Sequence, residues 1–177
     1  MSIFLLSGCQ KDEETNDNLV YFNEFQRFEY PNTWTGGKIG NDFALQFNSE
    51  KKSFMLFQLG NINESDTIQT IFDDVVKNLE GQFNILDDKN SYLDSNVAKD
   101  TLIEYSIESI SYLQRNIISI KDQKAHILIF RLKKENFNEI NPRINKVLES
   151  YKIYWFYFNL IISRFLGDTV SSLNILC

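Results

Sequence analysis

The chain has 177 residues, of which 43% are hydrophobic and 24% charged, as expected for a single globular domain with its own core. Its net charge of −6 and pI near 4.9 argue against nucleic-acid binding, which requires clustered Lys and Arg. The two cysteines, Cys9 and Cys177, form no CxxC pair, and we expect no metal site and no cofactor.

The N-terminus has the most informative motif. Leu6-Ser7-Gly8-Cys9 follows a short apolar run and resembles a bacterial lipobox, in which small residues precede the cleaved bond and the cysteine thiol receives lipid. The sequence therefore predicts a partial signal peptide over residues 1–9 and lipid attachment at Cys9. A complete signal has a basic segment and a longer apolar core, so we expect the reading frame to extend upstream of Met1.

Residues 10–18 (QKDEETNDN) are polar and acidic, and they are predicted to form a solvated tether. With Cys9, they predict an extracytoplasmic, membrane-anchored lipoprotein of the cell envelope. The alternative is a cytosolic protein in which LSGC occurs by chance.

The domain is predicted to span residues 19–153 and to begin with strands. Phe28 and Tyr30 alternate with polar residues until Pro31, and Trp34 follows at a turn. Residues 35–40 form a glycine-rich connection that lacks the spacing of a phosphate-binding loop. Apolar runs at 43–47 and 54–59 flank a polar turn and predict a hairpin.

An amphipathic helix is predicted next, capped by Ser65 or Asp66 and ended near Gly81. The neighbouring Asp73 and Asp74 are expected on its solvated face rather than in a metal site. The apolar stripe consists of Ile68, Ile71, Phe72, Val75, Val76, Leu79 and Phe83.

Residues 84–86 are predicted to begin a strand that leads into a polar loop at 87–96. This loop is rich in Asp and Asn oxygens but lacks the glycine and terminal glutamate of an EF-hand, so an exposed turn is favoured over a cation site.

From residue 101 the pattern is β. The alternation changes phase near Ser109, which predicts a bulge or bend. Residues 117–120 and 125–132 flank a turn at 122–124, and the second run is apolar on both faces, as in a central strand covered by helices on both sides. His126, the only histidine, is expected to be half-buried. Because no hydrolase or zinc-protease motif is present, we do not expect an enzyme.

A second helix is predicted from an N-cap at Asn141 and a first residue at Pro142, with an apolar stripe that includes Ile144 and Val147 and that Phe137 and Ile140 could extend backwards. Residues 151–153 then form a short closing strand. Residues 154–177 are an atypical apolar tail, too short in its apolar run for a transmembrane helix, and a non-native end is one reading of it.

This order of elements resembles the PsbP-like superfamily. The resemblance covers residues 25–153 and rests on a strand ending Tyr30-Pro31, Trp34 after it, and a final helix leading into Ser150-Tyr151-Lys152. It implies an α+β fold in which an antiparallel β-sheet has helices packed on its faces, as an α/β/α sandwich. It implies a binding or accessory domain and no catalytic residue.

The leading hypothesis is therefore a lipid-anchored cell-envelope protein with a non-catalytic domain that binds a partner protein. The alternative is a small-ligand, ion or carbohydrate binding module that uses a cleft near Trp34 or the loop at 87–96. A cytosolic protein of the same fold is the third possibility.

Overall fold

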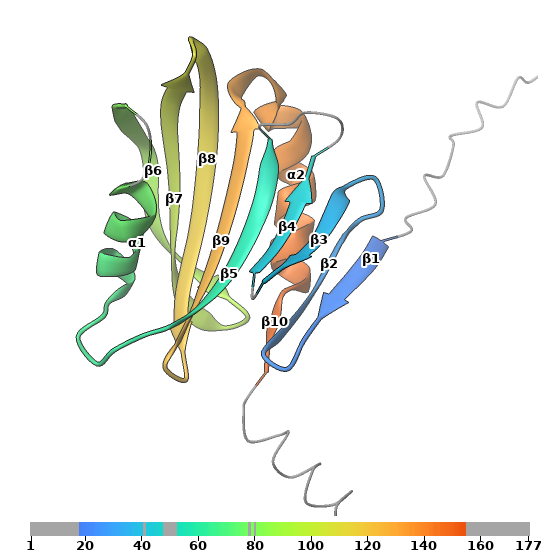
Figure 1. The fold of residues 1–177 in the computed structure, drawn as a ribbon, viewed down its shortest axis with the longest axis vertical. Helices are drawn as coiled ribbons and strands as arrows, with labels where there is room; N and C mark the ends of the chain where they lie inside the picture. Colours follow the sequence, from blue (N-terminus) through green and yellow to red (C-terminus); the bar gives the residue numbers. More distant parts are fainter. Residues whose placement is uncertain (1–17, 41, 48–52, 78, 80, 155–177) are drawn as a thin grey trace, which may run out of the picture.

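The computed structural model describes residues 18–40, 42–47, 53–77, 79 and 81–154. Cys9, the tether at 10–17, the turn at 48–52 and the tail at 155–177 lie outside the described residues. The remainder forms two antiparallel sheets and two α-helices (Figure 1). A seven-stranded sheet has the order β3-β4-β5-β9-β8-β7-β6, and a three-stranded sheet has the order β1-β2-β10.

The element bounds follow the chain. The strands are β1 (Asn18–Phe22), β2 (Gln26–Pro31), β3 (Thr35–Ile39), β4 (Asp42–Gln46), β5 (Phe54–Asn61), β6 (Phe83–Leu93), β7 (Asn96–Ile107), β8 (Ile110–Lys121), β9 (Lys124–Lys133) and β10 (Lys152–Ile153). The helices are α1 (Ile68–Lys77) and α2 (Phe137–Ser150), and a 3₁₀ turn at Lys134–Asn136 precedes α2.

β9 is the central strand of the large sheet, as its apolar sequence predicts. Leu128 and Phe130 belong to the core beneath α2, whereas Ile127 packs with the side chains beneath α1. Each face of the sheet thus carries a helix, which confirms the α+β class. The sandwich is only partial, because each helical layer is a single helix and most of the domain is strand.

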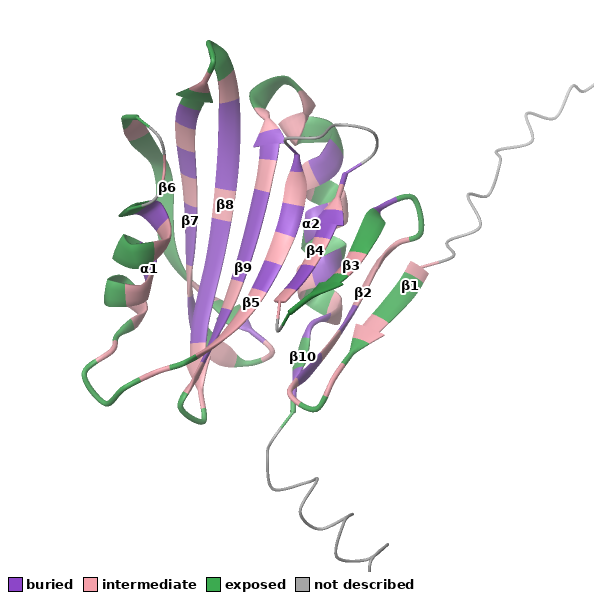
Figure 2. Cartoon of the chain, viewed as in Figure 1, coloured by how far each residue is buried: buried purple, intermediate pink, exposed green. Residues whose placement is uncertain are grey.

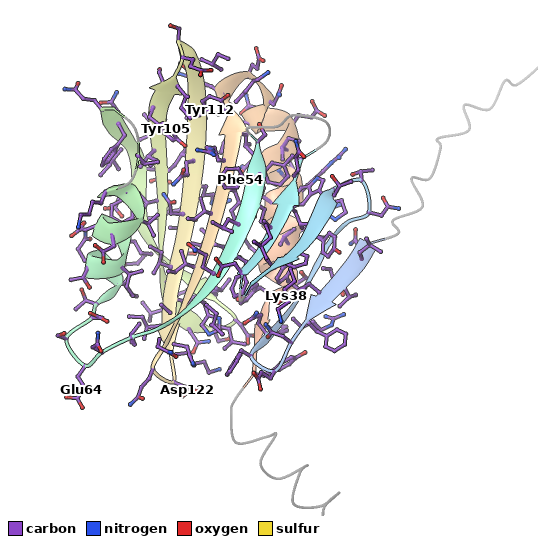
Figure 3. All side chains as sticks on the ribbon, viewed as in Figure 1. Lys38, Phe54, Glu64, Tyr105, Tyr112 and Asp122 are labelled. Atoms are coloured by element: carbon purple, nitrogen blue, oxygen red, sulfur yellow. The ribbon has the colours of Figure 1, made fainter. Side chains whose placement is uncertain are left out.

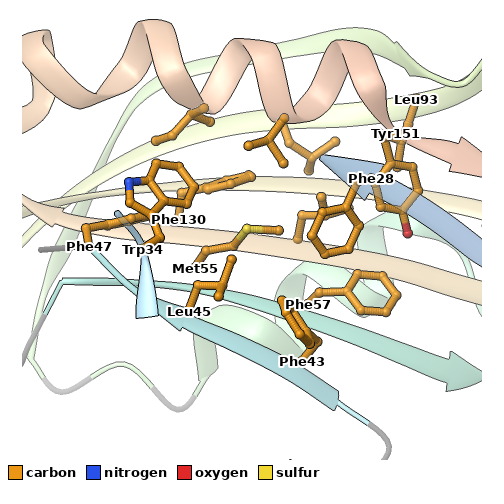
Figure 4. Close-up of a cluster of buried hydrophobic side chains, with 14 of the residues drawn as sticks. Phe28, Trp34, Phe43, Leu45, Phe47, Met55, Phe57, Leu93, Phe130 and Tyr151 are labelled. Carbon is orange, nitrogen blue, oxygen red and sulfur yellow. The ribbon is translucent and has the colours of Figure 1, made fainter. Parts of the chain in front are cut away.

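The larger core lies between the seven-stranded sheet, α2 and the small sheet (Figure 4). Phe28 of β2 stacks on Tyr151 at 5.7 Å between ring centroids, and it also contacts Phe43 and Phe57 of the large sheet. The indole of Trp34 is 2% exposed and meets Phe47 edge-on at 4.4 Å. Burial of these rings supplies much of the hydrophobic stabilisation of the domain.

The smaller core lies beneath α1. Phe72 and Val76 point from the helix onto Ile103, Tyr105 and Ile118. α1 packs mainly on β8, so in the described part of the chain no helix covers β4 and β5 on this side. Figure 2 shows buried and intermediate positions alternating along the first half of β5. Met55 and Phe57 belong to the larger core, so Phe54 and Leu56 face the uncovered side.

Four consecutive strands, β6 to β9, form a meander with tight turns. The turn residues at 94–95, 108–109 and 122–123 all have positive φ although none is glycine. Such values at both central positions give the turn twist that suits an antiparallel hairpin. The phase change near Ser109 is therefore a complete chain reversal, and the predicted bulge or bend was wrong. The hairpin at 122–124 is confirmed.

Two polar segments were predicted as connections and are strands. The glycine-rich segment pairs with β4 as β3, and residues 87–93 continue β6 along β7, so the predicted loop shrinks to a turn at Asp94 and Ser95. The hairpin of β4 and β5 and the closing strand β10 are confirmed. β1 was not predicted, and Asn18, assigned to the tether, is its first residue.

Both helix starts differ from the predictions. Thr67 caps α1: its Oγ1 accepts from the Thr70 N–H at 3.1 Å, and the Thr70 hydroxyl accepts from the Thr67 N–H at 2.9 Å. Asp66 instead accepts from the Asn63 N–H. α1 ends at Lys77, before Gly81, and Phe83 begins β6.

α2 begins at Phe137, so Pro142 lies inside the helix and Asn141 is not its cap. The helix starts earlier because Phe137 and Ile140 pack onto the core beneath it.

Candidate functional site

The residues singled out in the sequence do not come together into one site. The glycine-rich segment 35–40, which includes Lys38, contributes the edge strand β3, and Trp34 is a core residue, so its indole forms no cleft. Asp87 and Asp88 project from β6 and pair with Lys89 and Lys99. Among the described residues no group of three His, Cys, Asp or Glu side chains could hold a metal ion.

His126 is a core residue and is more deeply buried than expected, with 2% of its surface exposed. Its Nδ1 lies 3.1 Å from the hydroxyl of Tyr151. Burial lowers the pKa of His126 to about 4, with a smaller contribution from Lys121, so the ring is neutral at pH 7. Burial also raises the pKa of Tyr151, which therefore stays a neutral phenol. The pair ties β9 to the end of α2.

A groove of about 370 Å³ lies between α1 and the uncovered part of the sheet. Its floor is β5 and β9, including Gln58, Ile127 and Ile129, and its helical wall includes Ile71 and Val75. This volume is within the range of small-molecule sites, which usually combine an apolar lining with a few polar groups. We refer to this cavity as the α1 groove.

One end of the α1 groove is acidic. Asp66 and Asp74 both line it, beside Asn61 and Thr70. Asp66 accepts hydrogen bonds from Asn63, and neither carboxylate is in an ion pair among the described residues. This end of the groove therefore favours cationic or hydroxyl groups over anions.

A row of polar side chains lies on the same face of the sheet, beyond Ile129: Tyr105, Gln114, Asn116 and Arg131, called here the polar row. Arg131 Nη1 lies 3.4 Å from the Tyr105 hydroxyl, which donates to Gln114 Oε1 at 3.0 Å. Gln114 Nε2 donates to Asn116 Oδ1 at 2.8 Å. Burial raises the pKa of Tyr105, and Arg131 opposes that rise, so the phenol remains a donor.

Arg131 has a second contact, with an aromatic ring. Its guanidinium carbon lies 4.2 Å from the ring centroid of Phe54 on the neighbouring strand β5. Phe54 and Tyr105 lie toward the same end of the sheet (Figure 3). A cation over an aromatic face is stabilised by the quadrupole of the ring, but this contact does not neutralise the positive charge as an anion would.

The opposite face of the sheet holds an arginine with a full set of partners. Arg115 Nε and Nη2 donate to the two oxygens of Asp100 at 2.9 and 2.7 Å, and Nη1 reaches Asn141 and Asn145 of α2. Asp100 is 4% exposed. Since every polar group here has a partner, this cluster attaches α2 to the sheet and offers nothing to a ligand.

The sequence reasoning missed the α1 groove and the polar row. One signal was available: Arg131 is the one charged residue within the apolar run 125–132 of the central strand. A charge in a buried strand needs a partner, and the sequence does not show whether the protein supplies it.

The architecture is that of a PsbP-like domain, as the order of elements predicts. It is similar to the solution structure of the cyanobacterial PsbP protein CyanoP from Synechocystis, with a TM-score of 0.60 and 14% identity over 84% of this chain and 99% of that chain. It is also similar to LpqN of Mycobacterium tuberculosis, described as involved in cell envelope biogenesis, with a TM-score of 0.51 and 12% identity over 80% of this chain and 88% of that chain.

A Bacteroides thetaiotaomicron structure has a TM-score of 0.53 and 12% identity, and the match covers 73% of this chain and 45% of that chain. No family model matches the chain, and no curated protein does. At these identities the similarities establish the fold and leave the activity open. No described helix is long and apolar enough to cross a membrane.

Proposed function

We propose that this chain is a lipid-anchored accessory protein of the cell envelope whose PsbP-like domain binds a partner protein and catalyses no reaction. The observation that carries the proposal is the lipobox-like sequence ending at Cys9, followed by an acidic segment that leads to the first strand. The similarity to LpqN, a protein of cell envelope biogenesis, supports the envelope location.

The domain supports a binding role more than a catalytic one. The only histidine is hydrogen-bonded to a buried phenol and is held neutral, away from solvent. A general base must reach the proton that it removes, and His126 is too buried to do so. The uncovered face over β4 and β5 is the surface that we assign to the partner.

Lipid attachment is tested by expressing the chain with its in-frame upstream codons in a bacterium grown with an alkyne-labelled fatty acid. We expect Cys9 to carry the label and the protein to sediment with membranes. Cys9→Ser should abolish both, whereas the matched control Cys177→Ser should retain both. A free, unacylated Met1 in the mature protein, detected by mass spectrometry, would refute the anchoring and favour a cytosolic protein of the same fold.

A second candidate function is binding of a small ligand, and the α1 groove favours it because its volume of about 370 Å³ suits such a molecule. The site differs from the two that the sequence indicated, since Trp34 is buried and residues 87–93 belong to a strand. A ligand that binds only the folded state raises the melting temperature, so thermal unfolding with candidate ligands tests this function.

A further inference from the structure

Arg131 contacts the Tyr105 hydroxyl and the Phe54 ring, but no carboxylate neutralises its charge among the described residues. None of the ion pairs among the described residues includes it, although the chain is acidic overall. Arg115, on the opposite face, has a bidentate carboxylate and two amide oxygens. The contrast shows that this fold can neutralise an arginine on its sheet and does not neutralise Arg131.

The hydrogen bonds of the polar row leave donors unused. Arg131 Nε and Asn116 Nδ2 are buried and have no acceptor among the described residues, while the Asn116 side chain is fully buried. Gln114 lies between them in the row; its Oε1 accepts the hydrogen bond from Tyr105, and its Nε2 donates to Asn116. These two unpaired donors are enclosed, so the group that a ligand can reach is the half-buried Arg131 side chain, whose positive charge is complementary to an anion that accepts hydrogen bonds.

The surroundings of Arg131 define the rest of the ligand. Ile129 and Ile127 precede it on the same face of β9 and form the floor of the α1 groove, and Phe54 lies under its guanidinium. An apolar surface thus runs from the groove directly to the cation. At the far end, Asp66 and Asp74 would repel a second anionic group.

We propose that the α1 groove and Arg131 together bind a small amphipathic monocarboxylic acid. Its carboxylate accepts hydrogen bonds from the Arg131 guanidinium, whose planar fork matches two carboxylate oxygens. Its apolar body lies over Ile129 and Ile127 toward α1. This inference rests on the second candidate function, small-ligand binding in the α1 groove, and names the ligand class; it needs neither the lipid at Cys9 nor a partner protein.

The proposal is tested by calorimetric titration of the full-length, non-acylated Cys9→Ser chain with octanoate. Acetate lacks the apolar body, octanol lacks the charge, and octanedioate carries a second carboxylate toward Asp66 and Asp74. We expect octanoate to bind more tightly than all three. The Nε–H resonance of Arg131 should shift on titration, as expected if the carboxylate contacts the guanidinium.

Arg131→Gln should weaken octanoate binding by roughly tenfold or more, because a charge-assisted pair of hydrogen bonds is lost. Arg143→Gln removes the same charge from α2 and should leave the affinity unchanged. Arg131→Lys should bind between these limits, since an ammonium cannot form the planar fork. Circular dichroism of each variant establishes that it is folded.

Three outcomes would overturn the proposal. Equal affinities for acetate and octanoate would mean an adventitious anion site only, and equal affinities for octanol and octanoate would remove the role of Arg131. Failure of octanoate to bind, combined with binding of a glutamate-containing peptide that depends on Arg131, would assign the site to a carboxylate on a partner protein.

Discussion

Gly36 makes the closest backbone approach in the large sheet, and its substitution by alanine should destabilise the domain. At this position φ is +151°, and an added Cβ would lie 2.1 Å from the carbonyl oxygen of Ala44 and 3.0 Å from Cα of Leu45. Because ordinary contacts of this kind begin at about 3.4 Å, β3 must move away from β4 by more than an ångström. That movement breaks part of the pairing between Thr35–Ile39 and Asp42–Gln46.

The expected cost combines two effects. Steric overpacking in a fitted site costs about 1–3 kcal/mol, and an unfavourable φ for a residue with a side chain costs a further 1–3 kcal/mol or so. β3 is an edge strand and can relax toward solvent, so we expect a total of about 3 kcal/mol. For a domain of this size that loss lowers the melting temperature by roughly 6–12 °C.

The assay is urea and thermal unfolding of the wild type, Gly36→Ala and Gly37→Ala, followed by circular dichroism. Gly37 is the matched control, since an added Cβ there meets nothing within 4 Å. Its substitution should change stability by less than about 1 kcal/mol, because it mainly restricts the unfolded chain. If Gly36→Ala unfolds at the same urea concentration as Gly37→Ala, the close approach of β3 to β4 is wrong.

Three further perturbations concern single side chains. The free energy of unfolding should fall by up to roughly 3 kcal/mol as the pH falls from about 6.5 to about 4, because the His126 ring binds a proton in the unfolded chain but stays neutral in the folded core. In urea titrations at several pH values, His126→Gln should flatten this dependence. Asp100→Asn should cost about 3 kcal/mol by leaving the Arg115 charge without its partner, and strict additivity with Arg115→Gln in a double-mutant cycle would contradict this. Thr67→Val should cost about 1 kcal/mol and Thr67→Ser much less, measured by thermal unfolding, since only the latter keeps the cap of α1.

The elements that the sequence predicted correctly are those whose side chains report their surroundings. The strands β4, β5 and β9 carry apolar residues on the faces that become core, and α1 carries a stripe that matches its buried side. In each case the sequence pattern reflects burial, because the apolar side chains that face the core recur with the period of the strand or helix that carries them.

The missed strands have a different origin. The start of β6 at residues 84–86 was predicted, but its continuation over 87–93 is mostly exposed and β3 is rich in glycine, so neither of these segments shows an apolar pattern. Both form because a neighbouring strand offers unpaired backbone groups: β7 pairs with β6, and β4 pairs with β3. Backbone pairing leaves no trace in side-chain composition. The polar composition of residues 87–93 therefore predicted a loop, although these residues pair with β7.

The candidate site could not be inferred from the sequence because it depends on the absence of a carboxylate partner for Arg131 among the described residues. The sequence shows a single arginine in the run 125–132. It does not show that Arg115 lies on the face of the sheet where Asp100 can pair with it, whereas Arg131 lies on the opposite face, over Phe54 and away from any carboxylate partner. Trp34 was selected for its chemistry, and its ring completes the core instead.

The pairing of β2 has a consequence for the order in which the domain assembles. β2 lies between β1, its neighbour in sequence, and β10, which comes at the end of the domain. Joining strands that are so distant in sequence carries the entropic cost of closing a long loop, whereas the meander of β6 to β9 needs only short closures. As the chain is synthesised from its N-terminus, the meander of β6 to β9 can therefore form before β10 is available to pair with β2. The small sheet is then complete only after Lys152 and Ile153 have been synthesised and have paired with β2.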